Sequence, residues 1–450
     1  MSLLTSLQRW LGQKAARVLV REKPLVIAVT GSVGKSTTKQ AIGAILKADV
    51  AENAVRVPVG SYNNELGLPL TIFGCDAPGR NVFAWSVLVS RAWLMSMGLM
   101  KTGIKIFVLE MGADHPGDLE YLTRIAPPDI AVVTAITAGV DPNLIPVHLA
   151  NYPDIDALIA EKSWLIKRLK PGGIAIINAD DPKVFAMRHL TTERVFTYGE
   201  ADGTDIGILS KEIVVQDSPE GAMPVGLRTV LELYHRRTEI MLPGVYGTSV
   251  AYALAAAFCT AYAIDAIPED PQSIVQHFIP AKGRTRIIAG IKHTTLFDDT
   301  YNASPAAVIQ SLRDLASVPT KPGQRKIACL GEMRELGEKS SEMHRRVGAE
   351  AAKSGIDLLI CCGIFGPAMA EGALANGMRP DQVKAMKDTP EAGLFIQEIL
   401  KPGDIVLAKA SQGTLETQGV RMERVIKELM AEPLRASELL VRQEAAWQRK

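Results

Sequence analysis

The sequence predicts an α/β protein built on mostly parallel sheets, and three observations favour this fold class. Short apolar runs that fit buried strands alternate with longer segments of helical periodicity. The 450 residues are too many for one ordinary core, which suggests two or three domains. Hydrophobic residues make up 47% of the chain, as in soluble α/β proteins.

The charge balance and the cysteines indicate which partners and which cellular compartment to expect. Lys and Arg together number 50 and Asp and Glu number 49, so nothing favours nucleic acid or another polyanion as a partner. The five cysteines have no Cys-x-x-Cys spacing, and most lie in apolar runs. We therefore expect a reduced, cytoplasmic protein. We interpret Cys361 and Cys362 as part of a buried strand rather than a redox pair.

Residues 1–24 are predicted to form an N-terminal amphipathic helix. Apolar residues such as Leu7, Leu11 and Val18 recur at helical spacing, with Arg9 and Arg17 between them. These charges interrupt any long apolar core, so the segment does not fit a cleavable signal peptide. Packing against the rest of the protein is favoured. Peripheral contact with a membrane surface through residues 3–20 stays open as the alternative.

The stretch from Val26 to Thr38 contains the predicted phosphate-binding loop, to which the other predicted site residues are related. An apolar run is followed by a turn that contains Gly31 and Gly34 and then by a segment of helical periodicity. This order predicts a strand, a phosphate loop and a helix N-terminus. The usual spacing would put the first glycine at Val29, so this is a shorter G-x-x-G-K-S form, and a glycine turn without a ligand is the alternative. The predicted nucleotide-binding residues of the loop are Thr30, Gly31, Ser32, Val33, Gly34, Lys35, Ser36 and Thr37.

An apolar stretch of 19 residues, from Val82 to Met100, is long enough to cross a bilayer, but Arg91 lies at its centre. A central Arg costs at least about 2.5–3.5 kcal/mol on insertion. We therefore predict a buried or interfacial helix, with a membrane span as the less favoured alternative.

Strand patterns recur along the rest of the chain. In the first part they fall at 104–110, 130–134 and 174–178, and Glu110 ends the first of them. In open α/β sheets, ligands bind at the carboxyl ends of the strands. A second α/β unit has strand patterns at 296–299, 326–330, 356–360 and 404–407, after a candidate linker at 280–283. The predicted domains are 25–280 and 281–450, the latter closing in a helical tail.

Four further motifs occur in order along the chain. They are Ser61–Pro69, Glu110–Ala113, Asp298–Pro305, and Leu330–Gly337 with His344. Together with the loop they resemble the signatures of the Mur ligases, most closely the MurF type, which adds D-alanyl-D-alanine to a UDP-muramoyl tripeptide. The resemblance covers about residues 25 to 430.

The resemblance implies a P-loop ATPase domain with a mostly parallel sheet, followed by a smaller Rossmann-like α/β ligand-binding domain. It implies an ATP-dependent ligase of peptidoglycan precursor synthesis that uses two Mg²⁺ ions and a carbamylated lysine and forms an acyl phosphate. Its small-molecule substrates would be a UDP-muramoyl peptide and D-alanyl-D-alanine, and a monomer is expected. A Mur-like ligase for a different carboxylate stays open, as does a membrane-surface nucleotide-binding scaffold.

By the same resemblance, Lys35 would hold the ATP phosphates, and Ser36 and Glu110 would hold the first Mg²⁺. His148 would help to bind the second ion, and Lys162, 14 residues on, would be the carbamylated lysine. The structural alternatives are a solvated strand-end carboxylate for Glu110, a structural His148 and an unmodified surface Lys162.

In the second half, the resemblance implies that Arg284 reaches the γ-phosphate and that Asp299 faces the nucleotide. The candidate substrate-binding residues are Asn63, Asn64, Asn302 and Ser304, and the alternative for the last two is a turn before Pro305. Two departures from the family pattern stand out. Residues 245–250 lack the expected adenine-side Asn pair, and only about 25 residues precede the loop, where MurF-type enzymes carry a UDP-sugar-binding domain.

Overall fold

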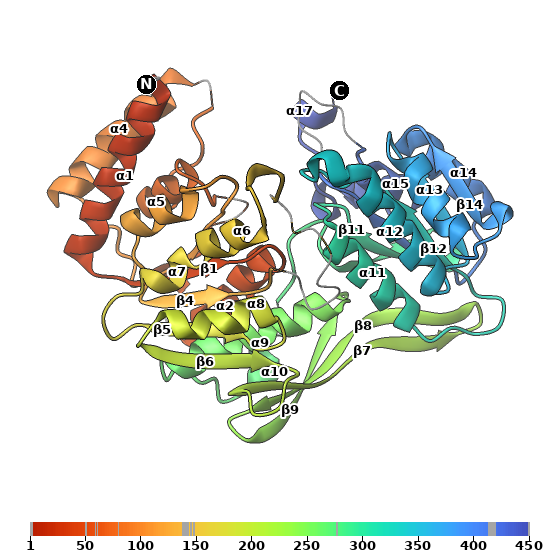
Figure 1. Ribbon diagram of the computed structural model, residues 1–450, viewed down its shortest axis with the longest axis horizontal. Coiled ribbons are helices and arrows are strands. Elements are labelled where there is room, and N and C mark those ends of the chain that lie inside the picture. Colours follow the sequence, from red (N-terminus) through yellow and green to blue (C-terminus); the bar gives the residue numbers. More distant parts are fainter. Residues whose placement is uncertain are drawn as a thin grey trace.

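The protein is built on two sheets that stand side by side (Figure 1). The computed structural model describes residues 3–49, 52–58, 60, 62–79, 81–136, 144, 146, 149–275, 278–412 and 420–448. A sheet of nine strands and its helices form what we call the first unit, and a sheet of six strands and its helices form the second unit. The boundary at residue 280 stays a prediction.

The first sheet is parallel around the strand that leads into the glycine loop. Strand β1 (Leu25–Thr30) lies between β3 (Ile106–Glu110) and β4 (Ile130–Val133). Because helices cover both faces, these strands are apolar except for Thr30 and Glu110, which end β1 and β3. The sheet continues through β2 (Val55–Arg56), β5 (Ile174–Asn178) and β6 (Arg194–Gly199). The carboxyl ends of β1 and β3 therefore meet at one edge.

Different helices cover the two faces of this sheet. One face packs on α2 (Lys35–Asp49) and α9 (Thr248–Ala263). The other packs on α1 (Leu3–Glu22), α3 (Gly67–Phe73), α4 (Val82–Met97), α5 (Asp118–Ile125) and α7 (Trp164–Lys167). The remaining helices of this unit are α6 (Ile155–Lys162), α8 (Pro182–Phe185) and α10 (Pro271–Val275).

The apolar face of α1 is buried, as predicted for a helix packed on the protein. Leu11, Ala15 and Val18 belong to the core of the first unit. Helix α4 lies beside α1 (Figure 1). Among the described residues, no helix is both long enough and apolar enough to cross a membrane.

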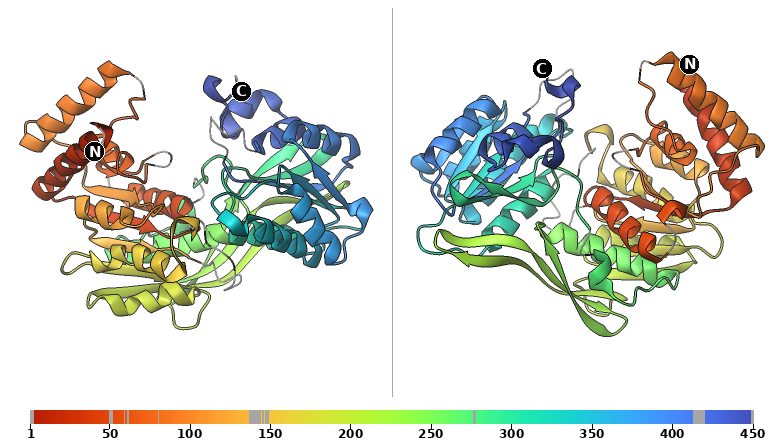
Figure 2. Two further views of the ribbon diagram at one scale, coloured as in Figure 1. Left: turned by 45° about the horizontal axis from the view of Figure 1, so that its top comes forward. Right: turned by 180° about the vertical axis from the view of Figure 1, so that it is seen from behind.

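Three antiparallel strands extend the first sheet toward the second unit. They are β7 (Ile206–Ser218), β8 (Gly221–Leu233) and β9 (Arg236–Pro243), and the first two form an arm beneath the second unit (Figure 2). Ile213 and Val215 pack against the core there, and the Lys321 ammonium lies 3.0 Å from the Asp217 carboxylate. The sequence does not predict these strands, because they are not continuous apolar runs.

The second sheet has one antiparallel edge strand, β10 (Arg286–Gly290), paired with β11 (Thr294–Asp299). Strands β15 (Ile405–Lys409), β12 (Lys326–Leu330), β13 (Leu358–Cys362) and β14 (Val383–Met386) follow in parallel. The prediction of two mostly parallel α/β sheets is therefore confirmed. Cys361 and Cys362 are buried in β13, as predicted.

Helices also cover both faces of the second sheet. One layer consists of α11 (Pro305–Ser317), α12 (Ser340–Lys353) and α13 (Gly366–Ala375). The other consists of α14 (Thr389–Ile399) and α15 (Glu423–Leu429). The short helices α16 (Ala436–Leu439) and α17 (Ala445–Gln448) form the tail.

Candidate functional site

The glycine loop joins β1 to α2 and is shaped by close contact with Thr134, the residue that follows β4. Gly31 and Gly34 have φ angles of +146° and +86°. A Cβ atom on Gly31 would lie 2.1 Å from Thr134 Oγ1, so only glycine fits there. The Thr134 hydroxyl donates to the Val33 carbonyl at 2.6 Å. The loop is thus held in a fixed shape at the N-terminus of a 15-residue helix, which suits an anion.

Cationic side chains converge on Glu110 at this loop. Lys39 Nζ lies 3.3 Å from Glu110 Oε2, and the Ser36 hydroxyl donates to Oε1 at 3.1 Å. Burial would raise the pKa of Glu110, but Lys39, Lys35 and Arg284 together lower it, so the group is a carboxylate. Glu110 is only 2% exposed, and the alternative of a solvated strand-end carboxylate is therefore wrong.

Lys162 lies beneath the loop. Its side chain is 0% exposed, and Nζ donates to the Gly31 carbonyl at 3.0 Å. The Lys35 ammonium donates to the same carbonyl at 2.8 Å. Burial, with repulsion from Lys35, lowers the pKa of Lys162 well below its ordinary value. The alternative of a surface lysine is therefore wrong. His148, the predicted companion ligand, lies outside the described residues.

The second unit contributes Arg284 to the same place. Its Nη2 donates to Ser36 Oγ at 3.4 Å, and its guanidinium lies 4.3 Å from the centre of the Tyr301 ring. Asp299, at the end of β11, accepts hydrogen bonds from Lys409 and from the Ser311 hydroxyl. Predicted residues from the two halves of the chain are thus brought together.

A cavity of about 770 Å³ opens between the two units. It places the loop opposite the segment that follows β11. The predicted residues that line it are Ser32, Val33, Gly34, Lys35, Ser36, Thr37, Asn63, Glu110, Arg284, Asp299, Asn302 and Ser304. Thr30, Gly31, Asn64 and Lys162 are not part of its lining.

Two of the predicted substrate residues have structural roles. Asn64 Oδ1 accepts from the Gly67 N–H at 2.8 Å at the start of α3, and Ser304 Oγ accepts from the Ala307 N–H at 3.3 Å as the N-cap of α11. For Ser304 this is the turn alternative. Asn302 is exposed and lines the cavity, so it is the better placed candidate.

The residues present fit a nucleotide triphosphate with Mg²⁺. Three cationic side chains, Lys35, Lys39 and Arg284, surround the carboxylate of Glu110, so added negative charge would be stabilised there. Ser36 and Glu110 offer the oxygen ligands that Mg²⁺ prefers, and Glu110 Oε2 lies 3.3 Å from the Lys39 ammonium. Among the residues that the structure describes, no group of three His, Cys, Asp or Glu side chains could hold a metal. Phosphate and water oxygens would add to the ligands that Ser36 and Glu110 offer.

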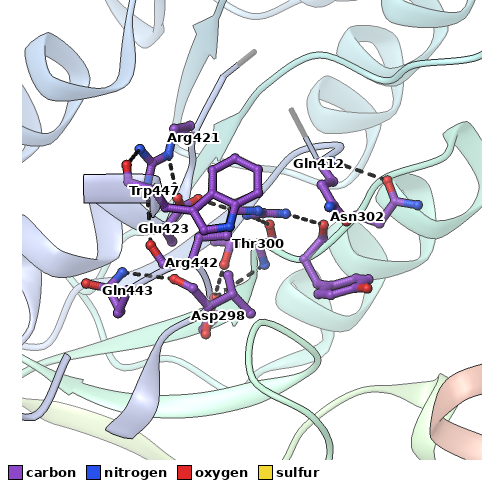
Figure 3. A network of polar contacts seen from close by, with 11 residues as sticks. Asp298, Thr300, Asn302, Gln412, Arg421, Glu423, Arg442, Gln443 and Trp447 are labelled. Atoms are coloured by element: carbon purple, nitrogen blue, oxygen red, sulfur yellow. Dashed lines mark hydrogen bonds and ion pairs between the residues drawn. The ribbon is translucent and has the colours of Figure 1, made fainter. Parts of the chain in front are cut away.

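Two cationic residues near the cavity, Lys39 and Arg442, were not among the predicted site residues. Lys39 follows Lys35 by one helical turn and therefore points to the same side of α2, which the spacing could have revealed. No spacing or motif in the sequence pointed to Arg442, which lies in the tail. Its guanidinium donates to the Thr300 carbonyl at 3.1 Å and the Tyr301 carbonyl at 2.7 Å, and pairs with Glu423 at 2.9 Å (Figure 3). It thereby holds the segment that carries Asn302.

The far end of the cavity lies where the expected Asn pair is missing. The Thr248 hydroxyl donates to Asp314 at 2.8 Å, and the Tyr252 hydroxyl donates to Asp180 at 2.7 Å and Glu200 at 2.9 Å. These residues line the cavity and offer polar groups in place of the Asn side chains.

Comparison with known proteins finds the same family in both units. The family model "Mur ligase middle domain" matches residues 92–260, and "Mur ligase, glutamate ligase domain" matches 283–412. The UDP-N-acetylmuramoyl-tripeptide–D-alanyl-D-alanine ligase of Mycobacterium leprae is 30% identical over 424 residues, covering 89% of this chain and 74% of that protein. Its counterpart in Bacillus subtilis is 27% identical, covering 96% and 80%.

A solved structure of the MurF ligase from Thermotoga maritima in complex with ADP has a similar fold. Its TM-score is 0.72 at 25% identity, and the match covers 94% of this chain and 83% of that one.

Proposed function

Because the chain belongs to the Mur ligase family of ATP-dependent carboxylate–amine ligases, we propose that it joins D-alanyl-D-alanine to the carboxylate of a UDP-muramoyl tripeptide in peptidoglycan precursor synthesis. A carboxylate oxygen attacks the γ-phosphorus of ATP and releases ADP. The amine of the dipeptide then attacks the carbonyl carbon of the acyl phosphate. Inorganic phosphate leaves, the nitrogen loses its proton, and an amide remains.

The observation that carries the proposal is the cavity between the units. Its first wall is the phosphate loop with Lys35 and Ser36, and its second is the segment with Asn302. Arg284 spans the two walls through its contact with Ser36. Phosphoryl transfer depends mainly on positioning and on stabilising charge, and such a cavity supports both.

We assign the remaining roles in the same proposal. Ser36 and Glu110 would hold one Mg²⁺, and His148 and a carbamylated Lys162 would hold a second. Bound Mg²⁺ supplies charge neutralisation at the transferring phosphoryl group. The burial and lowered pKa of Lys162 support the carbamate, because only the neutral amine reacts with CO₂. Asn63 and Asn302 contact the substrates, and Asp299 faces the nucleotide.

Phosphate release with ATP, Mg²⁺, UDP-muramoyl tripeptide and D-alanyl-D-alanine, with the product identified by mass spectrometry, tests the proposal. Release should require all the substrates. Lys35→Ala and Glu110→Ala should each lower turnover at least about 100-fold, as expected for the loss of one charge-stabilising group. The matched control is Lys384→Ala, a change of an exposed lysine on β14 that should leave turnover unaltered.

Two results would indicate a different function. Turnover with another carboxylate, and none with the muramoyl peptide, would indicate a Mur-like ligase of different specificity. Nucleotide binding without phosphate release for any substrate pair would indicate a scaffold.

A further inference from the structure

Helix α4 carries a stripe of exposed apolar side chains. Val82 is 81% exposed and Phe83 is 76% exposed, and Val87, Trp93 and Met97 are about half exposed. At 100° per residue these five residues, with Ser86 and Ser90, fall on one side of the helix. The apolar surface continues past the helix in Leu99 and Met100. An exposed apolar surface of this kind marks an interaction site.

The opposite side of α4 is already used in packing. Leu88, Ala92 and Met95 are buried in the core of the first unit. Helix α4 lies next to α1, at the end of the first unit that faces away from the second (Figures 1 and 2). The stripe therefore belongs to a well packed helix and lies away from the cavity between the units.

The segments that contain α4 and the neighbouring α1 are basic. Residues 3–24 and 82–105 together contain eight Lys and Arg but a single acidic residue, Glu22. The Glu22 carboxylate accepts from the Thr102 backbone N–H and hydroxyl. Arg21 donates to the Met95 carbonyl at 3.2 Å, which places a cation at the C-terminal end of the stripe. Exposed Lys23 and Lys101 extend this basic border.

We propose that the α4 stripe and its basic border dock the protein peripherally on an anionic lipid bilayer. Apolar side chains inserted at the headgroup boundary, with Lys and Arg on anionic headgroups, form the usual pattern of an interfacial helix. A Trp at the edge of such a stripe is also favoured at that boundary. A second copy of the chain is a poorer occupant, because a symmetric pair would bring two basic borders together. The proposal does not depend on the proposed ligase activity.

Sedimentation with lipid vesicles tests the proposal. The full chain should bind vesicles that contain phosphatidylglycerol and should bind those of phosphatidylcholine alone at least about tenfold more weakly. High salt should weaken the binding to anionic vesicles, because ions screen the basic border. Phe83→Glu and Met97→Glu should each reduce this binding at least about tenfold. Both changes lie on the exposed side of α4, so nucleotide binding should persist in both variants.

The matched control is Leu434→Glu, which adds the same charge at a side chain that is 97% exposed in the second unit. It should leave vesicle binding unaltered. Equal losses in Leu434→Glu and Phe83→Glu would overturn the proposal, as would failure of the full chain to bind anionic vesicles. A dimer in sedimentation velocity that Phe83→Glu dissociates, without vesicle binding, would instead identify a second copy as the occupant.

Discussion

Replacing Lys162 with Met tests whether this lysine works as a carbamate. Methionine keeps an unbranched apolar stem in a fully buried position but cannot react with CO₂. The fold should lose the hydrogen bond to the Gly31 carbonyl, or about 1 kcal/mol of unfolding free energy. Turnover should fall at least about 100-fold, which is about 2.7 kcal/mol of activation free energy.

The assay is phosphate release in CO₂-depleted buffer, with and without added bicarbonate. Wild-type activity should rise with bicarbonate, and a carbamate carbon should be detectable by NMR with ¹³C-bicarbonate. Neither signal should occur in Lys162→Met. In Lys162→Ala, added acetate should return an oxygen ligand to the vacated space and restore activity, whereas Lys162→Arg should not respond. A Lys162→Met protein with wild-type turnover and no response to bicarbonate would refute the reasoning.

Three further predictions concern the second unit. Arg284→Ala should lower turnover at least about 100-fold with little effect on nucleotide affinity, measured by calorimetry, because Lys35 stays in place; a large loss of affinity with normal turnover would contradict this. Arg442→Ala should lower the unfolding free energy by about 3 kcal/mol in urea, since it leaves the buried Glu423 with fewer partners, and the double change with Glu423→Gln should cost less; an additive loss would contradict the pairing. Burial raises the pKa of Asp298 to about 6. Between about pH 4 and 6 the folded chain therefore keeps a proton that the unfolded chain loses. The unfolding free energy should fall by up to about 3 kcal/mol as the pH rises through this range. Asp298→Asn should therefore stabilise the protein at pH 8 but not at pH 4, and equal urea midpoints at pH 8 would exclude the effect.

The sequence predicted the parallel strands well because their burial on both faces leaves a continuous apolar run. Strands β5 and β12 have the predicted bounds, and β1 lies directly before Gly31, where the apolar run predicted a strand. The arm of β7 and β8 was missed for the opposite reason. Its strands mix buried and exposed residues, and part of their burial comes from the second unit, which lies far away in sequence.

The candidate site was partly predictable. A loop motif fixes its own geometry, so Lys35 and Ser36 could be placed from local sequence alone. The burial of Lys162 could not be predicted from local sequence. Its Nζ donates to the Gly31 carbonyl of the loop, which lies 131 residues away in the chain. Arg442 reaches across a comparable separation to Thr300 and Tyr301 and belongs to none of the motifs.

The site is complete only where the two units meet. Lys35 and Lys39 lie on the first helix after the loop, and Arg284 comes from the second unit and reaches Ser36. The Glu110 carboxylate offsets part of the repulsion among these cations, and a polyphosphate bound among them would draw them together across the cavity. The arm of β7 and β8 keeps the units in contact independently of any ligand, through the packing of Ile213 and Val215. Apolar packing of the arm and the Glu110 carboxylate together allow these cations to lie close to one another before the nucleotide arrives.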